Sequence, residues 1–301
     1  MTGVMMNRLP PNPASGPAAS PIEVRELLFA SDLSPRCDSA LGHAGLLAER
    51  LGAHLTLFHA AQLPKADGPG IEQELWRRAE AAAREHLKGR AEALGVTPTI
   101  EVERAATPDA ALVERLRRAP PDLTVVVGHG RQGLAHVVSG SVTETVLEAT
   151  QRPLLCVREP EHGAALPYRR VLVPTDLTLP SRRVFGLAAA IARAFDAEVL
   201  ALHTAPLGTL PSLSGVPEVL EASLPQEYQV ADYLMPEFAG LRVAARLELG
   251  PPLDAILRTA RAERPDLIAL TTHGHDSLAD RWLGSLAEHV LREAPCPVLV
   301  A

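Results

Sequence analysis

Two loops of the sequence share a pattern of glycines that could bind an anion. The first contains Gly130, nine further residues and then Gly140-Ser141-Val142-Thr143-Glu144, and the second contains Gly274, nine further residues and then Gly284-Ser285-Leu286-Ala287-Glu288. Serine followed three residues later by glutamate is typical of a capping box at a helix N-terminus. The free N–H groups and positive dipole end of such a terminus attract phosphate, and glycines allow close approach to the backbone. The same spacing is also compatible with plain turns whose serines only cap the helices that follow.

An aspartate ends an apolar run at two further places. Asp32 follows the run LLFAS, and Asp176 follows the run VLVPT. A carboxylate at the end of a strand can accept a hydrogen bond from a ribose hydroxyl or a base amine, or it can bind a cation. In Asp-Leu-Ser-Pro and Asp-Leu-Thr it can instead cap the next helix. The residues alone leave both interpretations open.

The histidines and the known catalytic motifs add no reactive centre. His129 and His273 precede the glycines of the two loops, but no third ligand stands at helical spacing, so we predict no metal site. His59 and His203 end apolar runs, where a histidine commonly satisfies a backbone group. The Walker, nucleophile-elbow and kinase patterns are absent from the sequence. The sequence therefore predicts no catalytic residue.

These residues recur at a constant offset, which indicates how the chain is organised. An offset of 144 residues joins Asp32 to Asp176, His59 to His203, Gly140 to Gly284 and Pro153 to Pro297. Such self-similarity predicts a tandem duplication. We expect a disordered leader at 1–22, a domain at 23–158, a linker at 159–167 and a second domain at 168–301. The leader lacks the apolar centre of a signal peptide.

Each copy alternates short apolar runs with segments of helical periodicity. In the first copy we expect strands at 27–30, 55–60, 99–105, 123–130 and 153–157, with helices at 41–51, at 71–94, from Pro108 onwards and at 141–149. The inward face of the second helix is predicted to be Leu75, Ala79, Ala82, Leu87, Ala91 and Leu94. Wholly apolar strands joined by helices predict an α/β protein with a parallel, doubly wound, five-stranded sheet in each domain. The proline-broken stretch 205–240 predicts a short or distorted helix in the second copy.

Composition and charge exclude several classes of partner. The 301 residues are 47% hydrophobic and 22% charged, with a net charge of −7, so we expect neither nucleic acid nor an anionic membrane surface as a partner. No apolar run approaches the roughly 20 residues of a membrane-spanning helix. Cys37, Cys156 and Cys296 form neither a disulfide framework nor a metal-binding pair of cysteines. A reducing cytoplasm is the expected location.

With these motifs in place, the chain resembles a tandem universal stress protein over nearly all of residues 23–301. The resemblance rests on LLFASDLS and VLVPTDLT, on HGRQGLAHVVSGSVTETVL and HGHDSLADRWLGSLAEHVL, and on RPLLCV and APCPVLV. It implies the five-stranded fold of the adenine-nucleotide alpha-hydrolase-like group. It also implies that the fifth strands pair, so that the two halves form a pseudo-dimer within the chain; a homodimer of whole chains is the alternative.

The resemblance further implies a site for ATP or AMP, with or without Mg²⁺. The strand-one aspartates would hold the nucleoside, the residues after the strand-two histidines would recognise adenine through their backbone, and the glycine loops would bind the phosphates. The implied residues are Asp32, Ala60, Gly130, Gly140, Ser141, Val142, Asp176, Thr204, Gly274, Gly284, Ser285 and Leu286. The chain departs from the family pattern at the first motif glycine, which is replaced by Val127 and Thr271.

Three functions remain open on the sequence. The first is a regulatory stress-response module that binds adenine nucleotide and hydrolyses it slowly at most, because no general base or lysine clamp is recognised. The second is a universal stress protein without nucleotide binding that acts as a dimeric interaction scaffold, which the side chains of Val127 and Thr271 favour. The third is a weak ATPase or phosphotransferase that uses Asp32 or Asp176 with a divalent cation.

Overall fold

The structure, a computed structural model, divides into two compact units that are described separately. The N-terminal unit is Val24–Glu159, and the C-terminal unit is Pro160–Ala301 together with Met1–Glu23. The residues described are 7–8, 22–62, 69–128, 146–147, 150, 152–158, 166–205, 236–272 and 284–301. No helix among these residues is long and apolar enough to cross a membrane.

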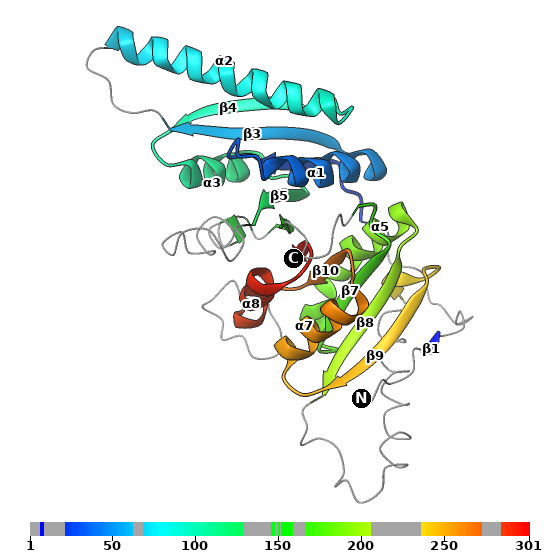
Figure 1. The fold of residues 1–301 in the computed structure, drawn as a ribbon. Helices are drawn as coiled ribbons and strands as arrows, with labels where there is room; N and C mark the ends of the chain where they lie inside the picture. The colour runs from blue at the N-terminus through cyan, green and yellow to red at the C-terminus, as the bar shows by residue number, and fades with distance from the viewer. Residues whose placement is uncertain are drawn as a thin grey trace, which may run out of the picture. The chain divides into compact units, whose positions relative to one another are not determined.

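The N-terminal unit is a parallel sheet with helical connections (Figure 1). Its elements are β2 (Glu26–Ala30), α1 (Cys37–Leu51), β3 (His54–Gln62), α2 (Pro69–Ala93), β4 (Thr99–Ala105), α3 (Pro108–Arg118), β5 (Leu123–Val127) and β6 (Leu154–Val157). The strands lie in the order β6-β5-β2-β3-β4, and every pair is parallel. Leu27, Leu28 and Phe29 of the central strand are buried, as expected where helices cover both faces of a parallel sheet. The predicted α/β doubly wound fold is confirmed.

The C-terminal unit repeats this topology. Its elements are β7 (Arg170–Thr175), the 3₁₀ helix η1 (Leu179–Val184), α5 (Phe185–Phe195), β8 (Glu198–Ala205), β9 (Val243–Leu249), α7 (Pro252–Glu263), β10 (Leu267–Leu270), α8 (Ser285–Glu293) and β11 (Val298–Val300). The order is β9-β8-β7-β10-β11, again all parallel. One further strand, β1 (Asn7–Arg8), pairs antiparallel with β9. Figure 1 shows α7 and α8 beside one another, and α7 packs against α8 in the structure.

The predicted inward face of α2 is confirmed at Leu87 and Ala91 and wrong at Leu75, Ala82 and Leu94. Ala83, Leu87 and Ala91 are buried, whereas Leu75 and Leu94 are 38% and 47% exposed. Ala82 is exposed as well. Trp76 instead packs beside Ala83 against Ala61 and Val102 of the sheet. Burying the aromatic ring covers more apolar area than burying the leucines at the helix ends, so Trp76 sets the rotation of the helix.

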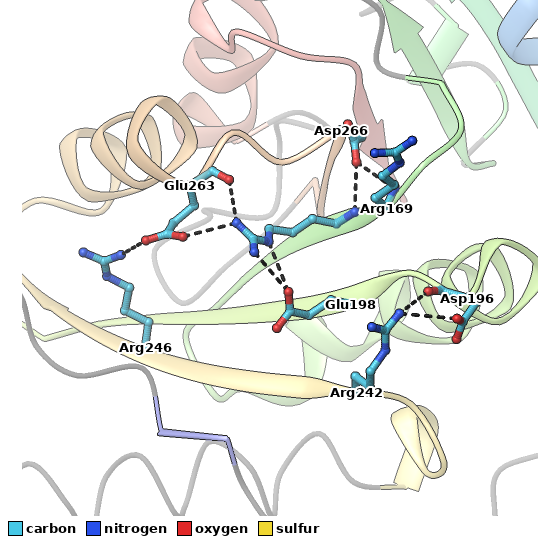
Figure 2. A network of polar contacts seen from close by, with 8 residues as sticks. Arg169, Asp196, Glu198, Arg242, Arg246, Glu263 and Asp266 are labelled. Carbon is cyan, nitrogen blue, oxygen red and sulfur yellow. Dashed lines mark hydrogen bonds and ion pairs between the residues drawn. The ribbon is translucent and has the colours of Figure 1, made fainter.

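An aspartate directly in front of the fourth strand connects two strands in each unit. Asp122 Oδ2 accepts the N–H groups of Arg25 and Glu26, at 2.8 and 3.0 Å. Asp266 Oδ2 accepts those of Arg169 and Arg170, at 2.7 and 2.9 Å (Figure 2). Each carboxylate therefore joins the start of the fourth strand to the start of the first, at the amino edge of the sheet. The sequence Pro-Asp-Leu, which occurs at 121–123 and again at 265–267, is the signal that could have identified this contact.

Several expectations fall on residues outside the described ones. These are the leader apart from Asn7–Arg8 and Ile22, most of the helix expected at 141–149, most of the linker at 159–167, and residues 206–235 of the proline-broken stretch.

Candidate functional site

The candidate site lies at the carboxyl edge of each sheet, where the strand order reverses. β2 lies between β3 and β5, and β7 lies between β8 and β10. The chain leaves the central strand towards one neighbour and returns later on the other side. In open parallel sheets the helices diverge at such a point, and ligands bind beyond the carboxyl ends of the strands there. Asp32 and Asp176 stand directly beyond the central strands at this point.

Each aspartate forms a local turn and does not cap a helix. Asp32 Oδ1 accepts the N–H of Ser34 at 2.9 Å. Asp176 Oδ1 accepts both the N–H of Thr178 at 3.0 Å and its hydroxyl at 2.7 Å. The helices that follow have Arg36 and Thr178 at their N-caps, so the helix-cap interpretation is wrong. Both aspartates are exposed at the carboxyl edge of the sheet.

The turn that carries each aspartate is strained in the same way in both units. Leu33 and Leu177 have φ angles of 60° and 61°, a left-handed conformation that residues other than glycine seldom adopt. The hydroxyls of Ser31 and Thr175 accept the N–H groups of these leucines at 3.1 Å. Strain of this kind persists where surrounding contacts enforce it, so the carboxylate is held in a fixed orientation.

The strand-two histidines hold the end of the central strand. His59 Nδ1 donates to the carbonyl of Ser31 at 2.8 Å, and His203 Nδ1 donates to that of Thr175 at 2.9 Å. The prediction that these histidines satisfy a backbone group is confirmed. Because each ring anchors the residue that precedes Asp32 or Asp176, it helps to position the carboxylate.

Ala60 and Thr204 lie inside strands and not after them. β3 continues beside β4 to Gln62, and β8 continues beside β9 to Ala205. The carbonyl of Phe58 accepts the N–H of Ser31 at 2.8 Å, so its peptide group points towards β2. Alternate residues of a strand direct their peptide groups to the same side. The N–H and C=O of Ala60 therefore point to the side of β2, beyond its last residue, Ala30, at the carboxyl edge of the sheet.

The start of α8 lies against the end of β10. Gly284 donates its N–H to the carbonyl of Thr272 at 2.7 Å, and a Cβ added to Gly284 would stand 2.8 Å from that same oxygen. A side chain at this position would therefore push the helix away from the strand. The close contact brings the first N–H groups of α8, which have no partner inside the helix, to the carboxyl edge of the sheet.

The capping box predicted at Ser285 and Glu288 is wrong. Gly284 is the N-cap residue, with φ −66° and ψ 147°, and α8 has no side-chain cap hydrogen bond. Ser285 is consequently the first residue of the helix. Glu288 instead pairs with Arg292 one turn later. Packing of Gly284 on Thr272 fixes the helix start one residue earlier than the local sequence pattern suggests.

The residues that replace the first motif glycine are both partly buried. Val127 is the last residue of β5, and Thr271 follows β10. Gly130, Gly140, Ser141 and Val142 of the first loop and Gly274 of the second lie outside the described residues.

A thiol lies beside the aspartate in one unit alone. Cys37 Sγ lies 2.9 Å from Asp32 Oδ1. Burial raises the pKa of the Cys37 thiol, so the neutral S–H donates to the carboxylate. At the matching place in the C-terminal unit Ser181 donates to the carbonyl of Thr178 at 2.8 Å. Across the described parts of both units, no three His, Cys, Asp or Glu side chains gather closely enough to hold a metal ion.

Fold and site thus define a doubly wound α/β protein built from two copies of one unit. The sequence profile of the Universal stress protein family matches residues 23–158 and again residues 167–301. The chain therefore belongs to the universal stress protein family, with two such domains in tandem.

Individual relatives agree with this assignment. A universal stress protein of Methanocaldococcus jannaschii is 34% identical over 139 residues, which are 44% of this chain and 81% of that protein. One of Thermus aquaticus is 32% identical over 137 residues, 44% of this chain and 98% of that protein. Among solved structures, a universal stress protein from Archaeoglobus fulgidus has a TM-score of 0.67 at 20% identity, covering 93% of this chain and 99% of its own. At that identity the structural likeness concerns the fold.

Proposed function

We propose that this tandem universal stress protein binds adenine nucleotide, ATP or AMP, at the carboxyl edge of its sheets and acts as a regulatory module in the cytoplasm. The observation that carries the proposal is the arrangement around the end of β7. There the exposed carboxylate of Asp176, the backbone of Thr204 and the N-terminus of α8 belong to adjacent elements at the carboxyl edge of one sheet.

Each of these groups suits a different part of a nucleotide. Peptide N–H and C=O groups directed past the end of the central strand match the donor and acceptor pattern of an adenine edge. A carboxylate in a rigid turn accepts hydrogen bonds from ribose hydroxyls. The N-terminus of α8 supplies N–H donors and the positive dipole end that favour phosphate.

The N-terminal unit presents the same elements at Asp32 and Ala60. We propose that the glycine loops from Gly130 to Val142 and from Gly274 to Leu286 complete both sites. The competing function is a nucleotide-free interaction scaffold, which the side chain of Val127 at the motif position favours for this unit.

Native mass spectrometry of the whole chain, with and without Mg-ATP, tests the proposal. One or two adenine-nucleotide masses per chain are expected. Protein that stays bare at millimolar ATP would refute nucleotide binding and favour the scaffold.

A pair of matched variants then locates the site. Asp176→Asn keeps an oxygen that can accept the hydrogen bonds of Thr178, but it removes the negative charge. This variant should weaken ATP binding at the C-terminal site by about tenfold, which corresponds to the loss of one charge-assisted hydrogen bond. Asp196→Asn removes the same charge at the end of α5, before β8 starts at the other edge of the sheet, and should leave binding unchanged. Equal affinities for the two variants would contradict the assignment of Asp176.

A further inference from the structure

The first helical segments of the two units carry opposite charges at matching positions. Asp38 and Glu49 belong to α1, and the residues 144 positions later, Arg182 and Arg193, belong to η1 and α5. Two acidic side chains of the N-terminal unit therefore correspond to two basic side chains of the C-terminal unit. The two units share one fold, so the fold itself does not require this reversal.

The helical segment that precedes the outer strand carries the complementary charge in each unit. In the N-terminal unit Arg90 of α2 donates from Nη1 to Asp38 Oδ2. In the C-terminal unit Glu237 Oε1 accepts hydrogen bonds from Arg182 Nη2 at 2.7 Å and from Arg182 Nε at 3.2 Å. Glu237 lies in the helical residues 236–238, shortly before β9. The same ion pair thus occurs in both units, with the acid and the base exchanged.

The second arginine of the C-terminal unit holds the end of the same helical segment. Arg193 Nη2 donates to the carbonyls of Glu237 and Ala239, at 2.5 and 3.2 Å. Cationic donors stabilise the C-terminal end of a helix, where the last carbonyls have no partner inside the helix. The matching Glu49 has no side-chain donor and carries the opposite charge. The N-terminal unit therefore offers no equivalent support to that helix end.

The side chains packed beside the ion pairs differ in size. Phe238 follows the ion-paired glutamate, is fully buried and lies edge to face against Phe185 of α5, with ring centroids 5.6 Å apart. Ala91 follows the ion-paired arginine of α2, and Leu41 matches Phe185 in α1; both are buried. A phenylalanine in the place of Ala91 would overfill the N-terminal unit, and an alanine in the place of Phe238 would leave a cavity in the C-terminal unit.

We propose that the reversed charges and unequal side chains assign α2 to the N-terminal unit and the helical segment 236–238 to the C-terminal unit. Exchange of the two segments would place Arg90 against Arg182 and Glu237 against Asp38. Like charges of this kind discriminate against a wrong partner. Misassembly between domains and exchange of an element between chains are the characteristic failures of repeated folds. The inference is independent of nucleotide binding.

Three full-length chains of equal net charge test this inference: the wild type, a double variant and a quadruple variant. The double variant, Asp38→Arg with Arg90→Glu, keeps an ion pair in the N-terminal unit but gives both units the same polarity. The quadruple variant adds Arg182→Glu and Glu237→Arg, which restores the difference with reversed sign. Each chain is refolded from urea at increasing protein concentration. Size-exclusion chromatography and thermal unfolding then give the fraction with the elution volume and melting temperature of the chain before unfolding.

The double variant should misassemble about fivefold more than the wild type, and the quadruple variant should match the wild type. A double variant that refolds as completely as the wild type would overturn the inference. A quadruple variant that misassembles as much as the double variant would also overturn it, because the new side chains and not the lost charge difference would then be responsible.

The ion pair itself is tested by rescue, which does not depend on refolding yield. Asp38→Arg alone places two cations together and should lower the melting temperature by about 3 °C. Adding Arg90→Glu should restore it. A melting temperature that stays low in the double variant would show that these two residues do not form the pair on which the assignment depends.

Discussion

Replacing Gly284 with alanine tests whether the contact between α8 and β10 builds the phosphate end of the C-terminal site. The φ and ψ of Gly284, −66° and 147°, are accessible to alanine, so the backbone itself is not strained by the change. The added Cβ would stand 2.8 Å from the Thr272 carbonyl oxygen, whereas ordinary contacts begin at 3.4 Å. The helix start must therefore move by about 0.6 Å, the difference between these two distances.

The expected costs follow from that displacement. The hydrogen bond from Gly284 to Thr272, now 2.7 Å long, is stretched or broken, which costs about 1 kcal/mol and lowers the melting temperature by about 3 °C. The N–H groups of the first turn of α8 move with the helix, and losing one well-aligned phosphate hydrogen bond weakens ATP binding at this site by about tenfold.

The assays are thermal unfolding and calorimetric titration with ATP. Gly89→Ala in α2 is the matched control, because a Cβ there would meet nothing within 4 Å; this variant should be slightly more stable, by about 0.5–1 kcal/mol, with unchanged binding. Wild-type affinity in Gly284→Ala would refute the reasoning about the helix terminus. An unchanged melting temperature would refute the reasoning about the contact itself.

Three further substitutions test the stability of the fold. Asp266→Ala removes the acceptor for two backbone N–H groups and should lower the free energy of unfolding by about 2 kcal/mol; an unchanged urea midpoint would contradict the contact. Burial lowers the pKa of His43 from 6.5 to about 4, so between these pH values the unfolded chain binds more protons than the folded one and stability falls as the pH falls. His43→Leu should remove about 3 kcal/mol of the loss of unfolding free energy between these pH values. Profiles of unfolding free energy against pH that run parallel in variant and wild type would contradict this prediction. Arg115→Ala leaves the half-buried carboxylate of Glu101 without its partner and should cost about 2–3 kcal/mol. Arg115→Thr combined with Glu101→Ala, the residues at the matching positions of the C-terminal unit, should recover most of that loss, and equal midpoints for the single and double variants would contradict the ion pair.

The strands and the order of elements were predictable because their signals are local. A run such as Leu27–Phe29 is apolar throughout, and only a strand covered on both faces suits such a run. The aspartates and the strand-two histidines were identified as candidates because they end such runs. Their partners within the turn, such as Ser34 and Thr178, also lie a few residues away in the sequence.

Within the described residues, the helices predicted at 41–51, at 71–94 and from Pro108 onwards exist, but details of α2 and α8 differ from the predictions. The rotation of α2 depends on where Trp76 meets the sheet, and the start of α8 depends on the contact of Gly284 with Thr272. The spacing of apolar residues along a helix is similar for slightly different rotations of the helix about its axis. A serine near a helix start is compatible with more than one N-cap position. Contacts with other elements decide between these possibilities.

The sequence by itself determined that the chain contains two copies of one parallel α/β unit, because a constant offset of 144 residues and continuous apolar runs need no tertiary information. Only the tertiary structure decided which groups meet at the carboxyl edge of each sheet. The direction of the Ala60 peptide and the approach of Gly284 to Thr272 both depend on strand register and on close approach between segments distant in sequence. The physical reason is that a register shift of one residue reverses the direction of every side chain and peptide group, and a strand that is apolar on both faces has no alternation in its sequence to specify the register.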